Sequence, residues 1–253
     1  MIQSSELRLH KHLANNGLCS RRDAEEWIRE GRIIVNGALA TIGQTIDPAR
    51  DKVYVDGKPM RPAPGSNTIL GFLVNKPRGY LCSHSDPHNS KVIYDLLPKE
   101  YRRLKLFCAG RLDKDSEGLV ILTNKGAFAQ AITHPSFEVI KRYQVILHRP
   151  FNPADLSRLL KGVVVEGEHL IAQRIIIPKG ADETNKRLEV HLAQGRKREI
   201  RRLFEALGYF VDRLKRTHIG PWSLHKIPRG CTRPIKERDI ESWMKKFDAK
   251  SAV

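Results

Sequence analysis

A polar loop followed by an apolar segment is the part of this sequence best suited to chemistry. The loop runs from Gly110 to Gly118, and its carboxylates are Asp113, Asp115 and Glu117. The apolar segment Leu119–Leu122 follows directly and predicts a buried strand. Such a strand is a rigid support for a carboxylate on irregular backbone, where it can act as a nucleophile or a proton acceptor. The same spacing also fits a solvated acidic turn or a calcium-binding loop.

A basic helix could bring a cation to that carboxylate. Residues 197–207 predict a helix with one buried face, because apolar side chains recur at helical spacing. Those side chains are Ile200, Leu203, Phe204 and Leu207. Arg201 follows Ile200 and lies about 100° further round the helix, at the edge of this face. It could therefore point into a site, although a solvated basic face is equally compatible with the pattern.

Tyr143 begins a predicted strand whose alternation places it on one face with Val145 and Leu147. A tyrosine in a hydrophobic core explains this pattern as well as one that contacts a ligand. Arg111 precedes the carboxylates on the same loop. Upstream, Asn75–Gly79 follows an apolar strand and contains Pro and Gly, which predicts a tight turn of mainly structural importance. The segment His84–His88 holds two histidines and an aspartate, but without a fourth ligand it is weak evidence for zinc.

The elements around these residues predict two domains. Residues 1–63 contain a helix over Glu6–Asn16, a second helix that begins at a capping box of Ser20 and Asp23, and short strands at 33–35 and 53–55. Residues 64–68 form the linker of a proline-rich segment. Residues 69–245 are rich in strands, at about 69–74, 119–122, 143–147, 170–177 and 187–192, with helices at about 125–132, 153–161 and 197–207. Because strands and helices do not alternate regularly, we expect an α+β fold with a mainly antiparallel mixed sheet flanked by helices, and a polar tail over 246–253.

The composition points to a polyanionic partner. The 253 residues contain 45 Lys and Arg against 28 Asp and Glu, a net charge of +17. Residues 1–65 hold 10 basic and 8 acidic residues, so nearly all of the excess lies in the second domain. An excess of this size is typical of proteins that bind nucleic acid. The sequence has no apolar run of membrane-spanning length, and its four cysteines form no CxxC pair, so we expect a cytoplasmic protein with reduced thiols.

Several motifs resemble those of the pseudouridine synthases, in the branch that modifies ribosomal RNA and includes the small-subunit enzyme and its large-subunit relatives. They occur in the family's order across about residues 70–235. The motifs are Asn75–Gly79, Val92–Pro98, Gly110–Gly126, His134–Pro135, Lys141–Tyr143 and Gly195–Arg202. The front domain resembles the RNA-binding domain named after ribosomal protein S-four, through Leu7–Ala14, Ser20–Ala24 and Gly31–Gly37.

The resemblance implies that the protein isomerises uridine within ribosomal RNA without a cofactor or a metal. The glycosidic bond is cleaved, and the uracil turns and is rejoined through a ring carbon. By motif position Asp113 is the essential carboxylate, with Arg201 as its salt-bridge partner. Ile200 and Tyr143 would contact the uracil, the tyrosine by stacking. Asp115 and Glu117 fall at positions that the family varies, so we expect them to be surface acids.

RNA contacts are expected from both domains. Arg111 would contact phosphate or fill the gap left by an extruded nucleotide, since a uridine in folded RNA must be flipped out before its glycosidic bond can be reached. Residues 194–238 carry 13 basic and 4 acidic residues and predict a phosphate-binding surface. The remaining candidate RNA-binding residues are Arg8, Lys11, Arg21, Arg22, Arg32, Arg196 and Lys197.

Other interpretations of the sequence stay open. The segment Gly195–Gly208 favours the large-subunit branch, while a small-subunit substrate is the alternative. A non-catalytic RNA-binding or ribosome-assembly factor would use the same basic surfaces, and a metal-dependent nuclease would need ligands that the sequence does not offer. We expect the protein to be a monomer that acts on ribosomal RNA or on an assembly intermediate.

Overall fold

The computed structural model describes residues 6–62, 68, 70–84, 91–102, 104–178 and 185–248. The chain divides into two compact units, Met1–Ile69 and Leu70–Val253. All but Thr68 of the predicted linker 64–68 lies outside the described residues. Within the described ranges, no helix combines the length and the apolar character needed to cross a lipid bilayer.

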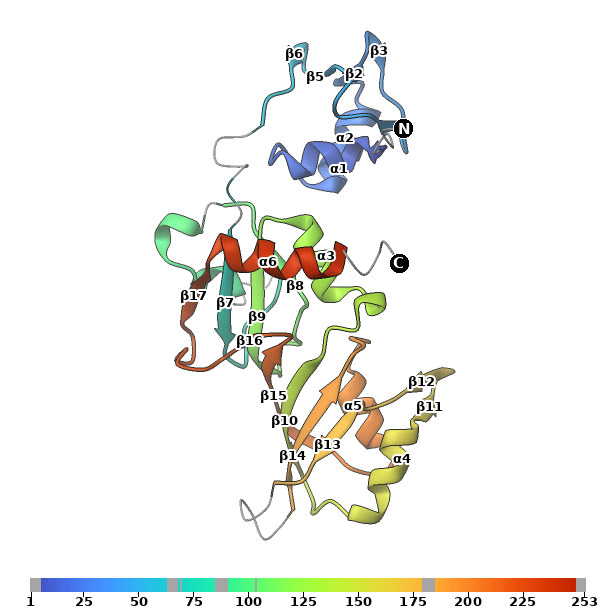
Figure 1. Cartoon of the computed structure of the whole chain (residues 1–253), viewed down its shortest axis with the longest axis vertical. Helices are drawn as coiled ribbons and strands as arrows, with labels where there is room; N and C mark the ends of the chain where they lie inside the picture. The colour runs from blue at the N-terminus through green and yellow to red at the C-terminus, as the bar shows by residue number, and fades with distance from the viewer. Residues whose placement is uncertain are drawn as a thin grey trace. The chain divides into compact units, whose positions relative to one another are not determined.

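The first unit consists of two helices packed on short strands (Figure 1). Its elements are β1 (Leu7–Arg8), α1 (Leu9–Asn15), α2 (Arg21–Arg29), β2 (Ile33–Val35), β3 (Ala38–Leu39), β4 (Thr45–Ile46), β5 (Val53–Val55) and β6 (Lys58–Pro59). The helix predicted to begin at Glu6 begins instead at Leu9, because Leu7 and Arg8 form β1 and pair with β4. The predicted capping box is confirmed: Ser20 Oγ accepts from Asp23 N at 3.1 Å, and Ser20 N donates to the Asp23 carboxylate at 3.0 Å.

The core of this unit follows the apolar pattern of its helices. Leu9 and Leu13 of α1 and Ile28 of α2 are buried together with Ile33 and Val53 of the sheet. The burial of these side chains is the main source of the unit's stability, since each contributes about 1.5–3 kcal/mol when removed from water. The helices therefore cover one face of the four-stranded sheet β3-β2-β5-β6.

The second unit is built on one nine-stranded sheet, which confirms the predicted α+β fold with a mainly antiparallel sheet. Its strands run in the order β13-β14-β10-β15-β9-β7-β17, with β16 beside β15 and β8 beside β9, and every pair except β15 with β9 is antiparallel. The strands are β7 (Gly71–Lys76), β8 (Phe107–Ala109), β9 (Glu117–Thr123), β10 (Lys141–Leu147), β13 (Arg174–Ile176), β14 (Arg187–Leu192), β15 (Val211–Ile219), β16 (Trp222–Ser223) and β17 (Thr232–Ile235). A separate hairpin pairs β11 (Val163–Val165) with β12 (Glu168–Leu170). The strand predicted over 170–177 is confirmed only for Arg174–Ile176, which form β13, because Leu170 ends β12 of the hairpin and the chain then passes into the large sheet.

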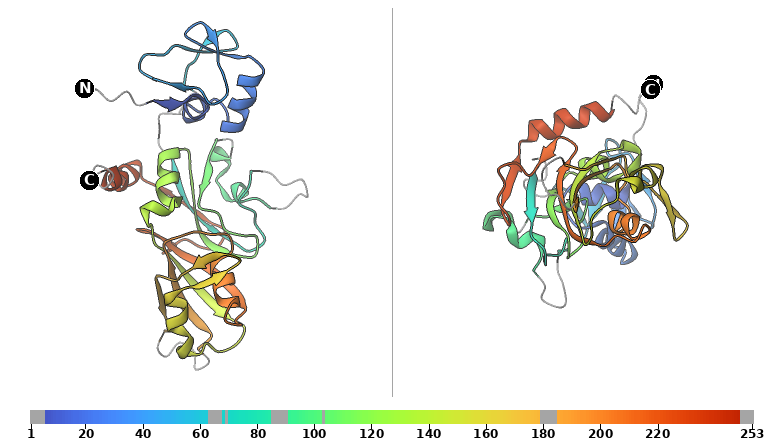
Figure 2. Two further views of the ribbon diagram at one scale, coloured as in Figure 1. Left: turned by 90° about the vertical axis from the view of Figure 1, so that its right-hand side faces the viewer. Right: turned by 90° about the horizontal axis from the view of Figure 1, so that it is seen from below.

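Short helices lie against this sheet (Figures 1 and 2). They are η1 (Ile93–Leu96), η2 (Lys99–Tyr101), α3 (Gly126–Thr133), η3 (Pro135–Phe137), η4 (Pro153–Asp155), α4 (Leu156–Lys161), α5 (Glu199–Glu205) and α6 (Glu237–Asp248). The helix predicted over 197–207 is shorter than expected, because Arg198 has a left-handed backbone with φ 51° and cannot belong to it. The tail predicted from residue 246 is also corrected, since α6 continues to Asp248.

Two hydrophobic clusters meet at the middle of the sheet. One contains the buried face of β10, β14 and α5, and the other contains Phe72, Val74 and Val120 of β7 and β9. Leu112, in the loop between β8 and β9, packs against both clusters. The loop that carries the candidate carboxylates is therefore fixed at the centre of the unit, beside the junction of β9 and β15.

Candidate active site

The candidate loop is a connection between two strands that leaves the carboxylates of Asp113 and Asp115 accessible. It begins after β8 at Gly110, whose φ of 85° favours glycine, and it ends where β9 starts at Glu117. Ser116 N donates to Asp113 O at 3.1 Å and closes a turn, while Gly79 N donates to Lys114 O at 2.7 Å. The side chain of Asp113 is 45% exposed. The turn Asn75–Gly79 thus braces the loop, and the carboxylate faces outward.

A buried lysine supports the loop from below. Lys76 has no exposed surface, and its Nζ donates to Ser116 O at 2.6 Å and to Pro77 O at 3.1 Å. Burial lowers the pKa of Lys76, and the carboxylates of Asp115 and Asp113 act in the opposite direction. The sequence pattern predicted only a structural turn for this residue. The available signal was a lysine two positions after the apolar run Phe72–Val74.

An ion-pair network surrounds Asp113, but its pairing differs from the prediction. Arg201 Nη2 lies 3.0 Å from a carboxylate oxygen of Asp115, not of Asp113. Arg198 Nη1 lies 3.7 Å from Asp113 and 3.6 Å from Asp115. The left-handed backbone at Arg198 directs the chain into α5 and brings this guanidinium to the loop. Asp113 therefore has a cationic neighbour, and Asp115 takes the position next to Arg201 that was expected for Asp113.

Arg201 retains hydrogen-bonding capacity in this network. Its side chain is 12% exposed, and its Nη1 donates to Val211 O at 2.6 Å. Among the described residues, its Nε and Nη2 complete no hydrogen bond despite their burial. Burial lowers the pKa of Arg201, whereas Asp115 and Asp113 raise it. The guanidinium is consequently fixed at one nitrogen and has donors available toward the acids.

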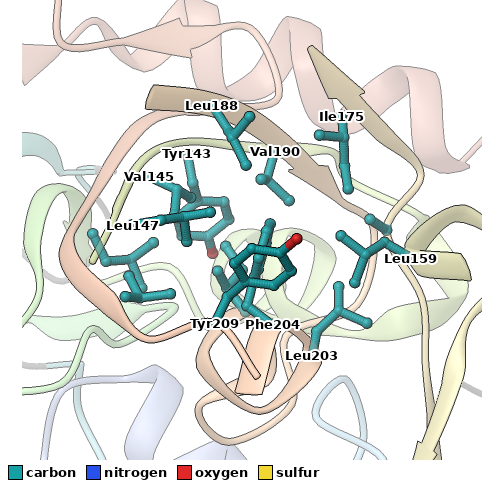
Figure 3. Packing of buried hydrophobic residues seen from close by; sticks show 14 of the residues in the cluster. Tyr143, Val145, Leu147, Leu159, Ile175, Leu188, Val190, Leu203, Phe204 and Tyr209 are labelled. Carbon is teal, nitrogen blue, oxygen red and sulfur yellow. The ribbon is translucent and has the colours of Figure 1, made fainter. Parts of the chain in front are cut away.

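Tyr143 and Ile200 belong to the hydrophobic cluster on which the loop rests. Tyr143 is 7% exposed and Ile200 is 3% exposed, and Figure 3 shows the tyrosine ring among Val145, Val190 and other buried side chains. The predicted alternation of β10 is confirmed, with Tyr143 and Val145 buried on the same face. Because Leu112 packs against this cluster, Tyr143 and Ile200 share one packed assembly with the residue that precedes Asp113.

The expectation that Glu117 is a surface acid is wrong. Its side chain is 8% exposed and accepts a hydrogen bond from Arg213 Nη2 at 2.7 Å. Glu117 lies in the first position of β9, where it pairs with Lys215 of β15. Since a buried carboxylate needs a cationic or hydrogen-bonding partner, its role here is to join these two strands. Asp115, by contrast, is 40% exposed and belongs to the network.

The candidate RNA-binding residues of the first unit differ in their exposure and in whether their side chains already have partners within the protein. Arg21 and Arg22 are exposed at the start of α2, Arg8 donates to Gly43 O, and Lys11 is half-buried. Arg32 is engaged by Asp56, with Nε 2.7 Å from its carboxylate, and its guanidinium lies 4.7 Å from the Trp27 ring centroid. A shallow cavity of about 340 Å³ in this unit contains none of these residues and is lined by Ile34, Asn36, Gly37, Lys52, Tyr54 and Gly57.

The candidate RNA-binding residues of the second unit also include both exposed side chains and one that lies near an acid. Arg111 is exposed on the loop, and Lys197 is exposed before α5. Arg196 Nη1 lies 4.0 Å from Glu168, so part of its charge is directed to the β11–β12 hairpin. Among the described residues no three His, Cys, Asp or Glu side chains form a potential metal site. Of the segment His84–His88, residues 85–88 lie outside the described part of the chain.

Comparisons with known proteins match both units of the chain to described families. Residues 71–206 match the family described as RNA pseudouridylate synthase, and residues 7–51 match the S4 domain. Ribosomal large subunit pseudouridine synthase B of Pseudomonas aeruginosa is 36% identical over 236 residues, which cover 92% of this chain but only 61% of the relative. Dual-specificity RNA pseudouridine synthase RluF of Escherichia coli K12 is 32% identical and covers 100% of this chain and 83% of its own length. A crystal structure described as a pseudouridylate synthase has a TM-score of 0.66 at 29% identity, with 93% of this chain and 98% of that chain covered.

The match to the family spans the Asp113 loop, the β10 tyrosine and the arginines at the start of α5, which are the residues that the structure gathers at the centre of the second unit. From the family match and the identity to its relatives, the chain belongs to the RNA pseudouridylate synthase family and carries an S4 domain in its first unit.

Proposed function

We propose that this protein isomerises uridine to pseudouridine in ribosomal RNA, with Asp113 as the catalytic carboxylate. The observation that carries the proposal is the position of Asp113: it lies on a braced, outward-facing loop within 3.7 Å of Arg198, in a chain of this family. The net charge of +17 and the S4 domain support a polyanionic RNA substrate. The name of the Pseudomonas relative favours large-subunit RNA.

The reaction needs a group that acts on the uridine and then leaves it. The bond between N1 of uracil and C1′ of ribose breaks, the base turns, and a bond forms between C5 and C1′. The proton on C5 is then lost, and N1 gains one, so the atoms balance without an added group. A carboxylate can serve as the nucleophile or as the base that takes the C5 proton. The Arg198 guanidinium, 3.7 Å away, would offset part of the cost of removing water from this charge once a base covers it.

The surroundings of Asp113 suit a flipped nucleotide. We infer that Tyr143 and Ile200 form the apolar wall against which the uracil lies, through the edges that their burial leaves accessible. Base stacking on an aromatic side chain contributes about 1–3 kcal/mol. The available donors of Arg201 would bind Asp113 or a uracil carbonyl, and the exposed Arg111 would contact the backbone of the extruded nucleotide. A substrate that enters this way removes water from the half-exposed carboxylate.

A test compares wild-type protein with Asp113→Asn on a ribosomal RNA transcript, with pseudouridine mapped by chemical modification and sequencing. We expect site-specific conversion by the wild type and none by the variant, with similar RNA affinity, since one charge is lost among many phosphate contacts. Asp212→Asn is the matched control, because Asp212 is an exposed acid on β15 and lies outside the network. Equal conversion by wild type and Asp113→Asn would refute the catalytic assignment.

The same assay separates the alternatives. A non-catalytic RNA-binding protein would bind the transcript in a salt-dependent manner and leave no modified nucleotide. Transcripts of both subunit RNAs, presented free and within assembly intermediates, would identify the substrate. Conversion only in small-subunit RNA would replace the large-subunit proposal while leaving the chemistry intact. The cytoplasmic location and the monomeric state remain predictions from the sequence.

A further inference from the structure

Arg216 is a buried arginine whose guanidinium lies beneath the catalytic loop. The residue belongs to β15 and is 4% exposed. Its Nη2 donates to Gly110 O at 2.8 Å, its Nε donates to Leu119 O at 2.7 Å, and its Nη1 lies 3.5 Å from Arg111 O. These carbonyls belong to the residues that precede Asp113 and to the strand that follows it. One side chain therefore connects both ends of the loop.

Among the described residues, no acid forms an ion pair with Arg216, and the hydrogen-bond partners of its guanidinium are backbone carbonyls. Two other buried cations, Lys141 and Lys76, lie close enough for the charge of Arg216 to change their pKa. Burial lowers the pKa of Lys141 to about 8 and lowers that of Lys76, and in both cases the Arg216 guanidinium adds to the effect. Burying cations together is unfavourable, so the carbonyl contacts of Arg216 must offset a desolvation cost in the folded protein.

The backbone of Arg216 lies at the junction of three strands. It pairs with Tyr143 of β10 on one side and with Gly118 of β9 on the other. The approach to Gly118 is close: a Cβ at that glycine would lie 2.2 Å from Arg216 O. The register of β10 with β15 also shifts between Arg142 and Tyr143. Arg216 is thus at the point where the strand of the candidate base-stacking residue meets the strand that ends the loop.

From this geometry we propose that Arg216 is a positioning residue, which fixes the distance between Asp113 and the tyrosine wall by holding the carbonyls on both sides of the loop. The proposal rests on the proposed function of Asp113. The side chain of Asp113 is 45% exposed, and the bonds from Gly79 and Lys76 hold the loop after Asp113, at Lys114 and Ser116, whereas Arg216 holds the residues before it. A displacement of about 1 Å in a reacting group can lower a rate about 100-fold.

The chemistry of arginine suits this task better than that of lysine. The planar guanidinium has five donors in a fixed fork and can hold carbonyls in different directions at once. A lysine at this position keeps the charge but provides a single ammonium on a flexible stem. Arg216→Lys therefore separates the loss of the geometry from the loss of the charge, and Arg216→Gln removes the charge while retaining a planar donor group.

The test measures the single-turnover conversion of a ribosomal RNA transcript with enzyme in excess, together with RNA affinity and thermal stability. We expect Arg216→Lys to lower the rate constant about 10- to 100-fold, with an RNA dissociation constant close to that of the wild type, since phosphate contacts are untouched. Arg216→Gln should show a loss at least as large. Arg149→Lys is the matched control, because Arg149 also donates to two carbonyls, Gly208 O at 3.1 Å and Leu207 O at 3.4 Å, away from the loop. It should convert RNA at the wild-type rate.

The outcomes distinguish positioning from a purely structural role. If Arg216 only stabilises the fold, Arg216→Lys will have a lower melting temperature but will convert RNA at the wild-type rate well below that temperature, which overturns the proposal. Failure of Arg216→Lys to fold would overturn it too. Asp113→Asn is assayed in parallel. A wild-type protein without activity, or an active Asp113→Asn, refutes the proposed function, whereas a wild-type rate for Arg216→Lys beside an inactive Asp113→Asn refutes this inference alone.

Discussion

Substitution of Asp115 by asparagine tests whether this acid is a partner of the network or part of the chemistry. Asp115 lies 3.0 Å from Arg201 and 3.6 Å from Arg198, and its side chain is 40% exposed. Asp115 is the water-accessible member of its pair with the largely buried Arg201, and ion pairs that water screens contribute about 0.2–1 kcal/mol each. Arg198 also keeps Asp113 as a neighbour at 3.7 Å. We therefore expect Asp115→Asn to lower the free energy of unfolding by about 1 kcal/mol, or about 2–4 °C in melting temperature.

The effect on catalysis should be small and of either sign. With the Asp115 charge removed, Arg201 has available donors and Asp113 as the remaining carboxylate beside it. A change of up to about 1 kcal/mol corresponds to no more than about fivefold in rate. Urea unfolding gives the stability, and single-turnover conversion of the transcript gives the rate, with Asp113→Asn as the inactive reference. A loss of conversion as complete as that of Asp113→Asn, at unchanged RNA affinity, would refute this reasoning and assign Asp115 to the chemistry.

Three further predictions concern stability, each measured by urea or thermal unfolding. Gly118→Ala should lower the free energy of unfolding by more than about 3 kcal/mol, since the added Cβ would lie 2.2 Å from Arg216 O. Gly57→Ala is the control, because Gly57 also has a positive φ but has open space around it, and it should cost about 1 kcal/mol. Equal costs for the two substitutions would contradict the close approach at Gly118. Ser20→Ala should cost about 1 kcal/mol through loss of the capping box, and an unchanged midpoint would show that the cap contributes nothing. The pKa of Lys141 is lowered to about 8 from 10.5, so between these values the unfolded chain binds a proton that the folded chain does not, and stability rises with pH. The difference in unfolding free energy between wild type and Lys141→Met should therefore increase from pH 8 to pH 10, and a constant difference would contradict the shift.

Local chemistry determined much of what could be predicted from the sequence. The capping box at Ser20 and the strands Ile33–Val35 and Arg187–Leu192 depend on residues close together in the chain, and the structure has them as expected. Periodicity also placed Tyr143 and Ile200 on buried faces. The motif around Asp113 identified the loop, because its glycines and its apolar strand are adjacent in sequence.

Tertiary structure decided the partners of the charged residues. No pattern in the sequence could reveal that Arg201 lies beside Asp115, that Glu117 is buried against Arg213, or that Arg216 reaches three carbonyls around the loop. These pairs join residues about a hundred positions apart or on separate elements, and small differences in helix start and strand register decide them. Composition and local pattern indicate which residues carry charge and which face of each helix or strand is apolar. Which charges meet depends on how the strands β9, β10 and β15 are brought together, and this is a property of the folded sheet alone.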